Sequence, residues 1–126
     1  MSEKFNIEYV FDKASRSSLW GHIATPAGLS EWFADAVTVE DDIYTFIWHK
    51  TPAEARLLEI SNSNYIRFHW LEETNPESYF ELRLHLIELT GGIMLEITDF
   101  AEKDETEDAI ILWETQIKTL KRVLGL

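Results

Sequence analysis

Two histidines, His69 and His85, are the residues that most resemble an acid–base pair. Histidine exchanges a proton near neutral pH, so two imidazoles facing one substrate could act as general acid and general base. Both, however, alternate with apolar residues in segments that have the period of a half-buried strand. The apolar neighbours should face the interior, which places both imidazoles on the solvent side. We therefore expect them to be ordinary cross-strand neighbours of Glu and Arg side chains.

Other reactive or metal-binding patterns are missing from the sequence. There is no cysteine, which excludes disulfides, thiolate metal sites and thiol nucleophiles. His22 and His49 are isolated, and no pair of histidines has the spacing of a zinc site. The chain also has no nucleophile elbow, P-loop or dinucleotide fingerprint. We therefore assign no catalytic residue, no metal ligand and no cofactor.

Arg56 is the main candidate for a charged group inside the fold. Under strict strand alternation it shares one side of its strand with Leu58 and Ile60. An inward guanidinium could hold the carboxylate of a ligand through two parallel hydrogen bonds. In the alternative interpretation, which we favour, Arg56 extends its charged end to water. Tyr44 and Tyr9 are the other polar groups that could reach the interior.

These side chains depend on a predicted run of strands for their positions. Alternating patterns and turn residues predict a first strand and then three hairpins, which together imply an antiparallel meander. The predicted strands span residues 5–11, 36–40, 43–49, 53–60, 65–71, 79–89 and 93–100, with turns at 41–42, 61–64 and 90–92.

Helical segments interrupt and end this run. A short helix is predicted to begin at Ser17-Ser18, and a second at Pro26 with Thr25 as its N-cap. After the last strand, Asp104 and Glu107 have the spacing of a capping box. Apolar residues then recur at three- and four-residue steps, as on one face of an amphipathic helix: Ile110, Trp113, Ile117, Leu120 and Leu124.

Together these elements predict one α+β domain over residues 1–126. Its curved antiparallel sheet of about six to seven strands should wrap around the long C-terminal helix, with two short helices after the first strand. The two short helices should form the notch against which the long helix rests.

Several motifs resemble those of the START-like, or SRPBCC, superfamily, in particular the branch similar to the activator of the heat-shock-protein-90 ATPase. They are Leu19-Trp20-x-x-Ile23-Ala24-Thr25-Pro26-x-x-Leu29-x-x-Trp32-Phe33, then residues 56–60 and 65–70, then Trp113, Ile117 and Leu120. The resemblance implies a helix-grip fold with a deep apolar cavity between helix and sheet. Members bind lipids, sterols, polyketides or plant hormones, and others are cyclases or co-chaperones. The chain departs from the pattern at Leu112-Trp113, where Gly-Trp is usual.

Strand alternation indicates which side chains should face that cavity. The predicted ligand-binding residues lie on the inner side of the strands and on the apolar stripe of the helix, with Arg56 as the polar member. They are Tyr44, Phe46, Trp48, Arg56, Phe68, Trp70, Trp113 and Ile117. The same bulky rings could instead fill the interior themselves, and the sequence does not distinguish lining from filling.

The charge of the chain limits its partners. A net charge of −12 should repel nucleic acids and anionic membranes. With no signal-peptide core and no membrane-spanning run, we expect a cytoplasmic protein.

We rank non-catalytic binding of a small hydrophobic or amphipathic ligand first, a protein-interaction or co-chaperone-like module second, and a cyclase- or hydrolase-type enzyme third. A homodimer could form at the strand edge of residues 36–40.

Overall fold

Seven antiparallel strands form one curved sheet in the order β1-β7-β6-β5-β4-β3-β2. The structure is a computed structural model that describes residues 2–126. The strands are β1 Ser2–Phe11, β2 Ala36–Glu40, β3 Ile43–Trp48, β4 Thr51–Ser61, β5 Tyr65–Trp70, β6 Phe80–Leu86 and β7 Ile93–Glu102. β1 and β2 lie at the two edges, so the predicted edge strand at residues 36–40 is confirmed.

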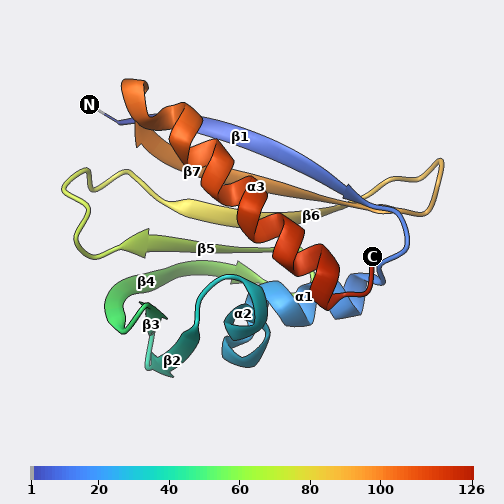
Figure 1. Ribbon diagram of the computed structural model, residues 1–126, viewed down its shortest axis with the longest axis horizontal. Coiled ribbons are helices and arrows are strands. Elements are labelled where there is room, and N and C mark those ends of the chain that lie inside the picture. Colours follow the sequence, from blue (N-terminus) through green and yellow to red (C-terminus); the bar gives the residue numbers. More distant parts are fainter. Residues whose placement is uncertain (1) are drawn as a thin grey trace.

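Three α-helices and one short 3-10 turn complete the chain. They are α1 Arg16–Ala24, α2 Pro26–Trp32, η1 Lys103–Glu105 and α3 Thr106–Val123. Figure 1 shows α3 lying diagonally across the sheet, with α1 and α2 near its C-terminal end. This arrangement confirms the predicted helix-grip architecture. None of the described helices is long and apolar enough to cross a membrane.

The helix starts agree with the sequence in one case and differ in two. Thr25 caps α2, as predicted, because its hydroxyl accepts a hydrogen bond of 3.0 Å from the Gly28 N–H. α1 begins earlier than predicted, because the Ser15 hydroxyl accepts from the Ser18 N–H. The capping box at Asp104 is wrong, because that residue already lies inside η1 and α3 has no side-chain cap.

A β-bulge in β4 changes which residues of that strand face the interior. Up to Leu57, which pairs with Phe68, the register with β5 is continuous, and it shifts by one residue before Glu59 pairs with Arg67. The extra residue is Leu58. A bulge reverses the inward and outward alternation for every residue beyond it. Strict alternation therefore fails within this strand.

The apolar core lies between the sheet and the three helices. Trp113, Ile117 and Leu120 are the buried residues of α3, which confirms the predicted stripe. α2 packs against the same helix, because the Gln116 side chain donates a 2.9 Å hydrogen bond to the carbonyl of Phe33, just after α2. α2 therefore supports α3, as predicted for the short helices, while α1 packs mainly on α2 and the sheet.

Gly28 allows α1 and α2 to approach each other closely. A Cβ atom at this position would lie 2.0 Å from the Gly21 carbonyl oxygen and 2.5 Å from the His22 Cα. Both atoms belong to the backbone of α1, so neither can move aside without displacing the helix. Only glycine fits this contact.

We predict that Gly28→Ala lowers the free energy of unfolding by about 3 kcal/mol or more, because the new methyl group overlaps backbone atoms. Gly21→Ala is the matched control: it lies within α1, and a Cβ added there would have no other atom within 4 Å. This control should raise the free energy of unfolding by about 0.5–1 kcal/mol, the helix-propensity gain of alanine over glycine. Urea unfolding measures both, and equal effects of the two variants would contradict the close-contact account.

Candidate functional site

Aromatic rings occupy the space between α3 and the sheet, where the family resemblance implied a cavity. Phe46 and Phe68 are fully buried, with ring centroids 5.8 Å apart. Phe80 stacks on Phe68 with ring centroids 5.0 Å apart, and the ring centroid of Trp113, on α3, lies 6.3 Å from that of Phe80. These contacts lie in the range of favourable aromatic packing. The rings therefore fill this part of the interior themselves.

Phe33, immediately after α2, connects these rings. It is 4% exposed, and its ring contacts five other aromatic rings with centroid separations of 5.1 to 5.8 Å. Its carbonyl oxygen accepts hydrogen bonds from Trp48 Nε1 at 2.8 Å and from Gln116 Nε2 at 2.9 Å. The last carbonyls of a helix lack partners within it, and these two side chains supply them. One residue thus joins α2, β3 and α3.

A groove of about 580 Å³ opens next to Phe33, between the end of α2, the end of β3 and the outer side of α3. We call it the α2–α3 groove. Its apolar lining includes Trp32, Phe33, Ala34, Trp48 and Leu112. Its polar lining includes Ser30, Glu31, Asp35, His49, Thr115, Gln116 and Thr119. The groove therefore combines an apolar, largely aromatic part with a polar part of similar extent.

The structure separates the predicted site residues into three groups. Five of them are buried in the ring-filled core, namely Tyr44, Phe46, Phe68, Trp113 and Ile117. Trp48 and Trp70 are only half-buried and line surface pockets. Arg56 lies apart from both groups. Sequence alternation therefore found the inner face, and it did not show that most of this face is filled.

An inward Arg56 is contradicted by the structure. Arg56 pairs with Ile43 and His69 on the outer face, its side chain is 55% exposed, and its Nε lies 3.6 Å from an oxygen of Asp42. The bulge at Leu58 explains the difference, because it reverses the alternation on which the inward placement depended. Arg56 therefore extends to solvent, as the alternative interpretation held.

The histidines do not form an acid–base pair. His69 Nδ1 lies 2.8 Å from the carbonyl oxygen of Ser78, while His85 Nε2 lies 2.9 Å from a carboxylate oxygen of Glu96. Each imidazole thus has its own partner on the outer face, which confirms the solvent-side placement. His22 contacts Glu31 at 3.2 Å.

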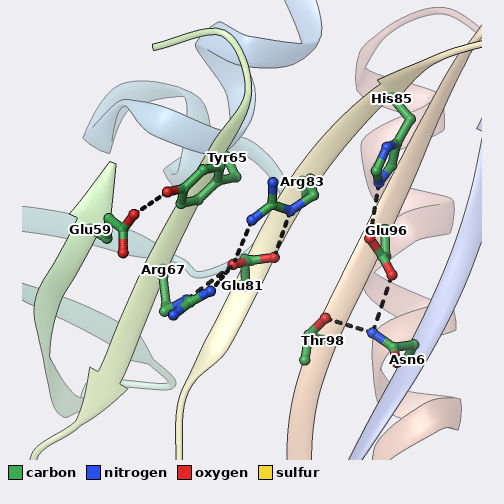
Figure 2. Close-up of polar contacts among 9 residues, drawn as sticks. All are labelled: Asn6, Glu59, Tyr65, Arg67, Glu81, Arg83, His85, Glu96 and Thr98. Atoms are coloured by element: carbon green, nitrogen blue, oxygen red, sulfur yellow. Dashed lines mark hydrogen bonds and ion pairs between the residues drawn. The ribbon is translucent and has the colours of Figure 1, made fainter. Parts of the chain in front are cut away.

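The outer face of the sheet holds a network of charges, shown in Figure 2. Its centre is Glu81, which is only 5% exposed although no helix covers it. Arg67 donates to Glu81 Oε1 at 2.8 Å, and Arg83 donates to Oε2 at 2.9 Å. The two guanidinium groups stack over the rings of Tyr79 and Tyr65. Burial by itself raises the pKa of Glu81, but the two arginines outweigh it and hold the pKa below its ordinary value.

Asp99 is a carboxylate inside the fold that sequence reasoning missed. It lies two residues beyond Ile97 on the inner side of β7, so the same alternation could have found it. Its Oδ2 accepts from Trp113 Nε1 at 2.9 Å, and its Oδ1 accepts from the Phe100 N–H. Burial raises the pKa of Asp99 to about 6, the nearby charge of Glu73 adds to the rise, and the two hydrogen bonds oppose it. In this geometry the carboxylate positions Trp113, and both of its oxygens are engaged.

Comparison with known proteins identifies the family. The model of the START-like superfamily domain matches residues 1–126, so the chain belongs to this superfamily. The solution structure of BfR322 from Bacteroides fragilis is 43% identical, with 97% of this chain and 90% of that chain covered and a TM-score of 0.68. No curated protein matches the chain.

Two more distant structures share the fold. The Aha1 dimer from Colwellia psychrerythraea is 15% identical, with a TM-score of 0.79 and coverage of 97% of this chain and 96% of that chain. The crystal structure of CalU16 from Micromonospora echinospora is 19% identical, with a TM-score of 0.77 and coverage of 98% and 76%. At such identities the similarity establishes the architecture and leaves the activity of this chain open.

The raised pKa of Asp99 predicts how stability depends on pH. The folded pKa of about 6 exceeds the ordinary value of 3.8, so the native state binds more protons than the unfolded state between these two values. The free energy of unfolding should therefore fall by about 2 kcal/mol as pH rises from 4 to 7 on account of this group. Asp99→Asn removes the titration while keeping an acceptor for Trp113.

The test compares urea unfolding of the wild type and the variant at several pH values. The stability of Asp99→Asn relative to the wild type should increase from pH 4 to pH 7. Asp104→Asn, measured in the same way, controls for the removal of an exposed carboxylate. Parallel curves for Asp99→Asn and the wild type would show that the Asp99 carboxylate is not protonated at low pH in the way described.

Proposed function

We propose that this protein is a non-catalytic binding module that holds a small hydrophobic or amphipathic ligand in the α2–α3 groove. The proposal rests mainly on one observation: a groove of about 580 Å³, lined in part by aromatic residues, opens beside an interior that aromatic side chains fill. A ligand would then lie at the mouth of the helix grip, against Trp48 and Phe33. This position differs from the deep internal cavity that the family resemblance implied.

The composition of the groove supports an amphipathic ligand. Trp32 and Trp48 direct their N–H groups to the carbonyls of His22 and Phe33, so both rings are held in fixed orientations. Fixed aromatic surfaces bind apolar groups with little loss of conformational freedom. Thr115 and Thr119 on α3 also line the groove, and because their hydroxyls donate to the carbonyls of Ile111 and Thr115, they can offer a ligand hydrogen-bond acceptors. A ligand with one apolar face and one hydrogen-bonding edge matches this arrangement.

The superfamily gives independent support, because START-like folds often bind hydrophobic ligands. The chemistry of the interior supports a binding role over a catalytic one. Asp99, the inward carboxylate, uses both of its oxygens in hydrogen bonds to Trp113 and the backbone of Phe100. A general acid or base needs a free position within reach of its substrate.

A protein-interaction role is the second candidate, and the edge of the sheet favours it. Within residues 2–126, β2 is paired only with β3 and forms an edge of the sheet, and Val39 on this strand is 40% exposed. Edge strands of this kind readily pair with another chain. The solved Aha1 structure with the same fold is a dimer.

Leu112 gives a direct test of the groove. It lies on α3, is 61% exposed and lines the groove, while the adjacent Ile111 is 60% exposed and points elsewhere. We predict that Leu112→Glu weakens binding of 1-naphthol, a neutral amphipathic probe, by about tenfold, because a charge replaces apolar surface. Ile111→Glu, the control, should leave the affinity unchanged.

Two measurements test ligand binding in the groove. Titration of labelled protein with 1-naphthol should shift the indole N–H signals of Trp32 and Trp48. Native mass spectrometry of protein purified from cells should detect a small molecule that is released on unfolding. Equal loss of probe binding in both glutamate variants, or shifts confined to residues outside the groove, would contradict the assignment.

A further inference from the structure

A second pocket lies on the other side of Trp48, at the ends of β3 and β5. It has a volume of about 340 Å³ and is lined by Trp48, Ala53, Glu54, Trp70, Glu72 and Glu73. We call it the indole pocket. It shares Trp48 with the α2–α3 groove and otherwise has its own residues.

The two indoles are held firmly from the core side. Their ring centroids lie 6.0 Å apart with an angle of 55° between the planes. Trp70 stacks on the buried Phe80 at 4.9 Å, and Trp48 stacks on the buried Phe46 at 6.0 Å. The rings therefore present a tilted, preorganised pair of aromatic surfaces to the pocket. Aromatic faces carry partial negative charge and attract cations.

All the charged residues that line the indole pocket are acidic. Glu54, Glu72 and Glu73 contribute three carboxylates among six lining residues, and none of the six is a lysine, arginine or histidine. Glu72 and Glu73 are exposed, so they form the rim of the pocket and can approach a ligand freely. The electrostatic field of Glu73 also reaches Asp99 in the neighbouring interior. Negative charge and aromatic surface thus converge on one hollow.

We propose that the indole pocket binds a small organic cation, an alkylammonium or quaternary ammonium group, between Trp48 and Trp70 with Glu72 and Glu73 at its rim. The methyl or methylene groups of such a cation pack on the indoles, and its charge is balanced by the ring faces and the carboxylates. This site is separate from the α2–α3 groove, and its existence does not depend on the function proposed for that groove.

The same chemistry disfavours the other classes of occupant. A metal ion needs several oxygen or nitrogen ligands at short range, and residues 2–126 contain no group of three or more acidic or histidine side chains placed to hold one. A neutral apolar ligand gains nothing from the carboxylates. An anion would be repelled by them and by the net charge of −12.

Choline is the probe, and its neutral carbon analogue 3,3-dimethyl-1-butanol has the same shape without the charge. Titration of the labelled protein at constant ionic strength should give saturable shifts of the Trp48 and Trp70 indole N–H signals with choline. The neutral analogue should bind at least about tenfold more weakly, because it lacks the cation–π and ionic contacts. The Trp32 indole lines only the groove and should stay unshifted, so the two sites are read separately.

The variants test which residues hold the charge. The double substitution of Glu72→Gln and Glu73→Gln should weaken choline binding by about three- to tenfold without unfolding the protein, because both side chains are exposed. Glu88→Gln, an exposed glutamate outside the pocket, is the control for loss of surface charge and should change the affinity by less than about twofold at this ionic strength. Trp70→Leu should abolish binding, with the fold checked by circular dichroism.

Three results would overturn the proposal. One is equal affinity for choline and its neutral analogue. Another is the absence of saturable shifts at Trp48 and Trp70. The third is an equal loss of affinity in the Glu88→Gln control and in the Glu72/Glu73 double variant, which would mean that choline responds only to the overall charge of the protein.

Discussion

The packing of Phe33 is the interaction on which the rest of the structure depends. Its ring meets rings from α2, β3, β6 and α3, and its carbonyl accepts hydrogen bonds from Trp48 and Gln116. Helices and sheets bury their apolar faces through side-chain contact, and here one residue supplies contacts to both layers. The close approach of α1 and α2 at Gly28 fixes the position of α2, and therefore the place where Phe33 enters the core.

This packing changes where the helix grip can act. A curved sheet around one helix would leave a void if the facing side chains were small. In this chain phenylalanine and tryptophan side chains occupy that space, and native interiors tolerate few voids. The open surfaces then lie at the rim, where Trp48 separates the α2–α3 groove from the indole pocket. One wall of fixed aromatic rings thus borders two hollows with different electrostatic character, one mixed polar and one acidic.

The sequence predicted the architecture well, because hydrophobic periodicity and turn residues determine element type. The prediction of which side chains face the interior failed where the alternation of a strand is interrupted. The bulge at Leu58 has no glycine or proline to announce it, so Arg56 was placed by an alternation that the strand does not keep. Asp99 lies two residues beyond Ile97 on the inner side of β7, so the same alternation would have identified it. Glu81 faces outward and is still buried, because Arg67 and Arg83 cover it while their guanidinium groups stack on tyrosine rings. No local sequence pattern predicts such a tertiary arrangement.

The central claim is that aromatic rings fill the space between α3 and the sheet, which leaves the open surfaces at the rim. Crystals of the wild-type protein under xenon pressure test this claim most directly, because xenon enters apolar cavities that water leaves empty. The account predicts no ordered xenon among Phe33, Phe46 and Phe68, with any xenon confined to the α2–α3 groove and other surface sites. An ordered xenon atom between these three rings and α3 would show that the interior is a cavity, and would contradict the account.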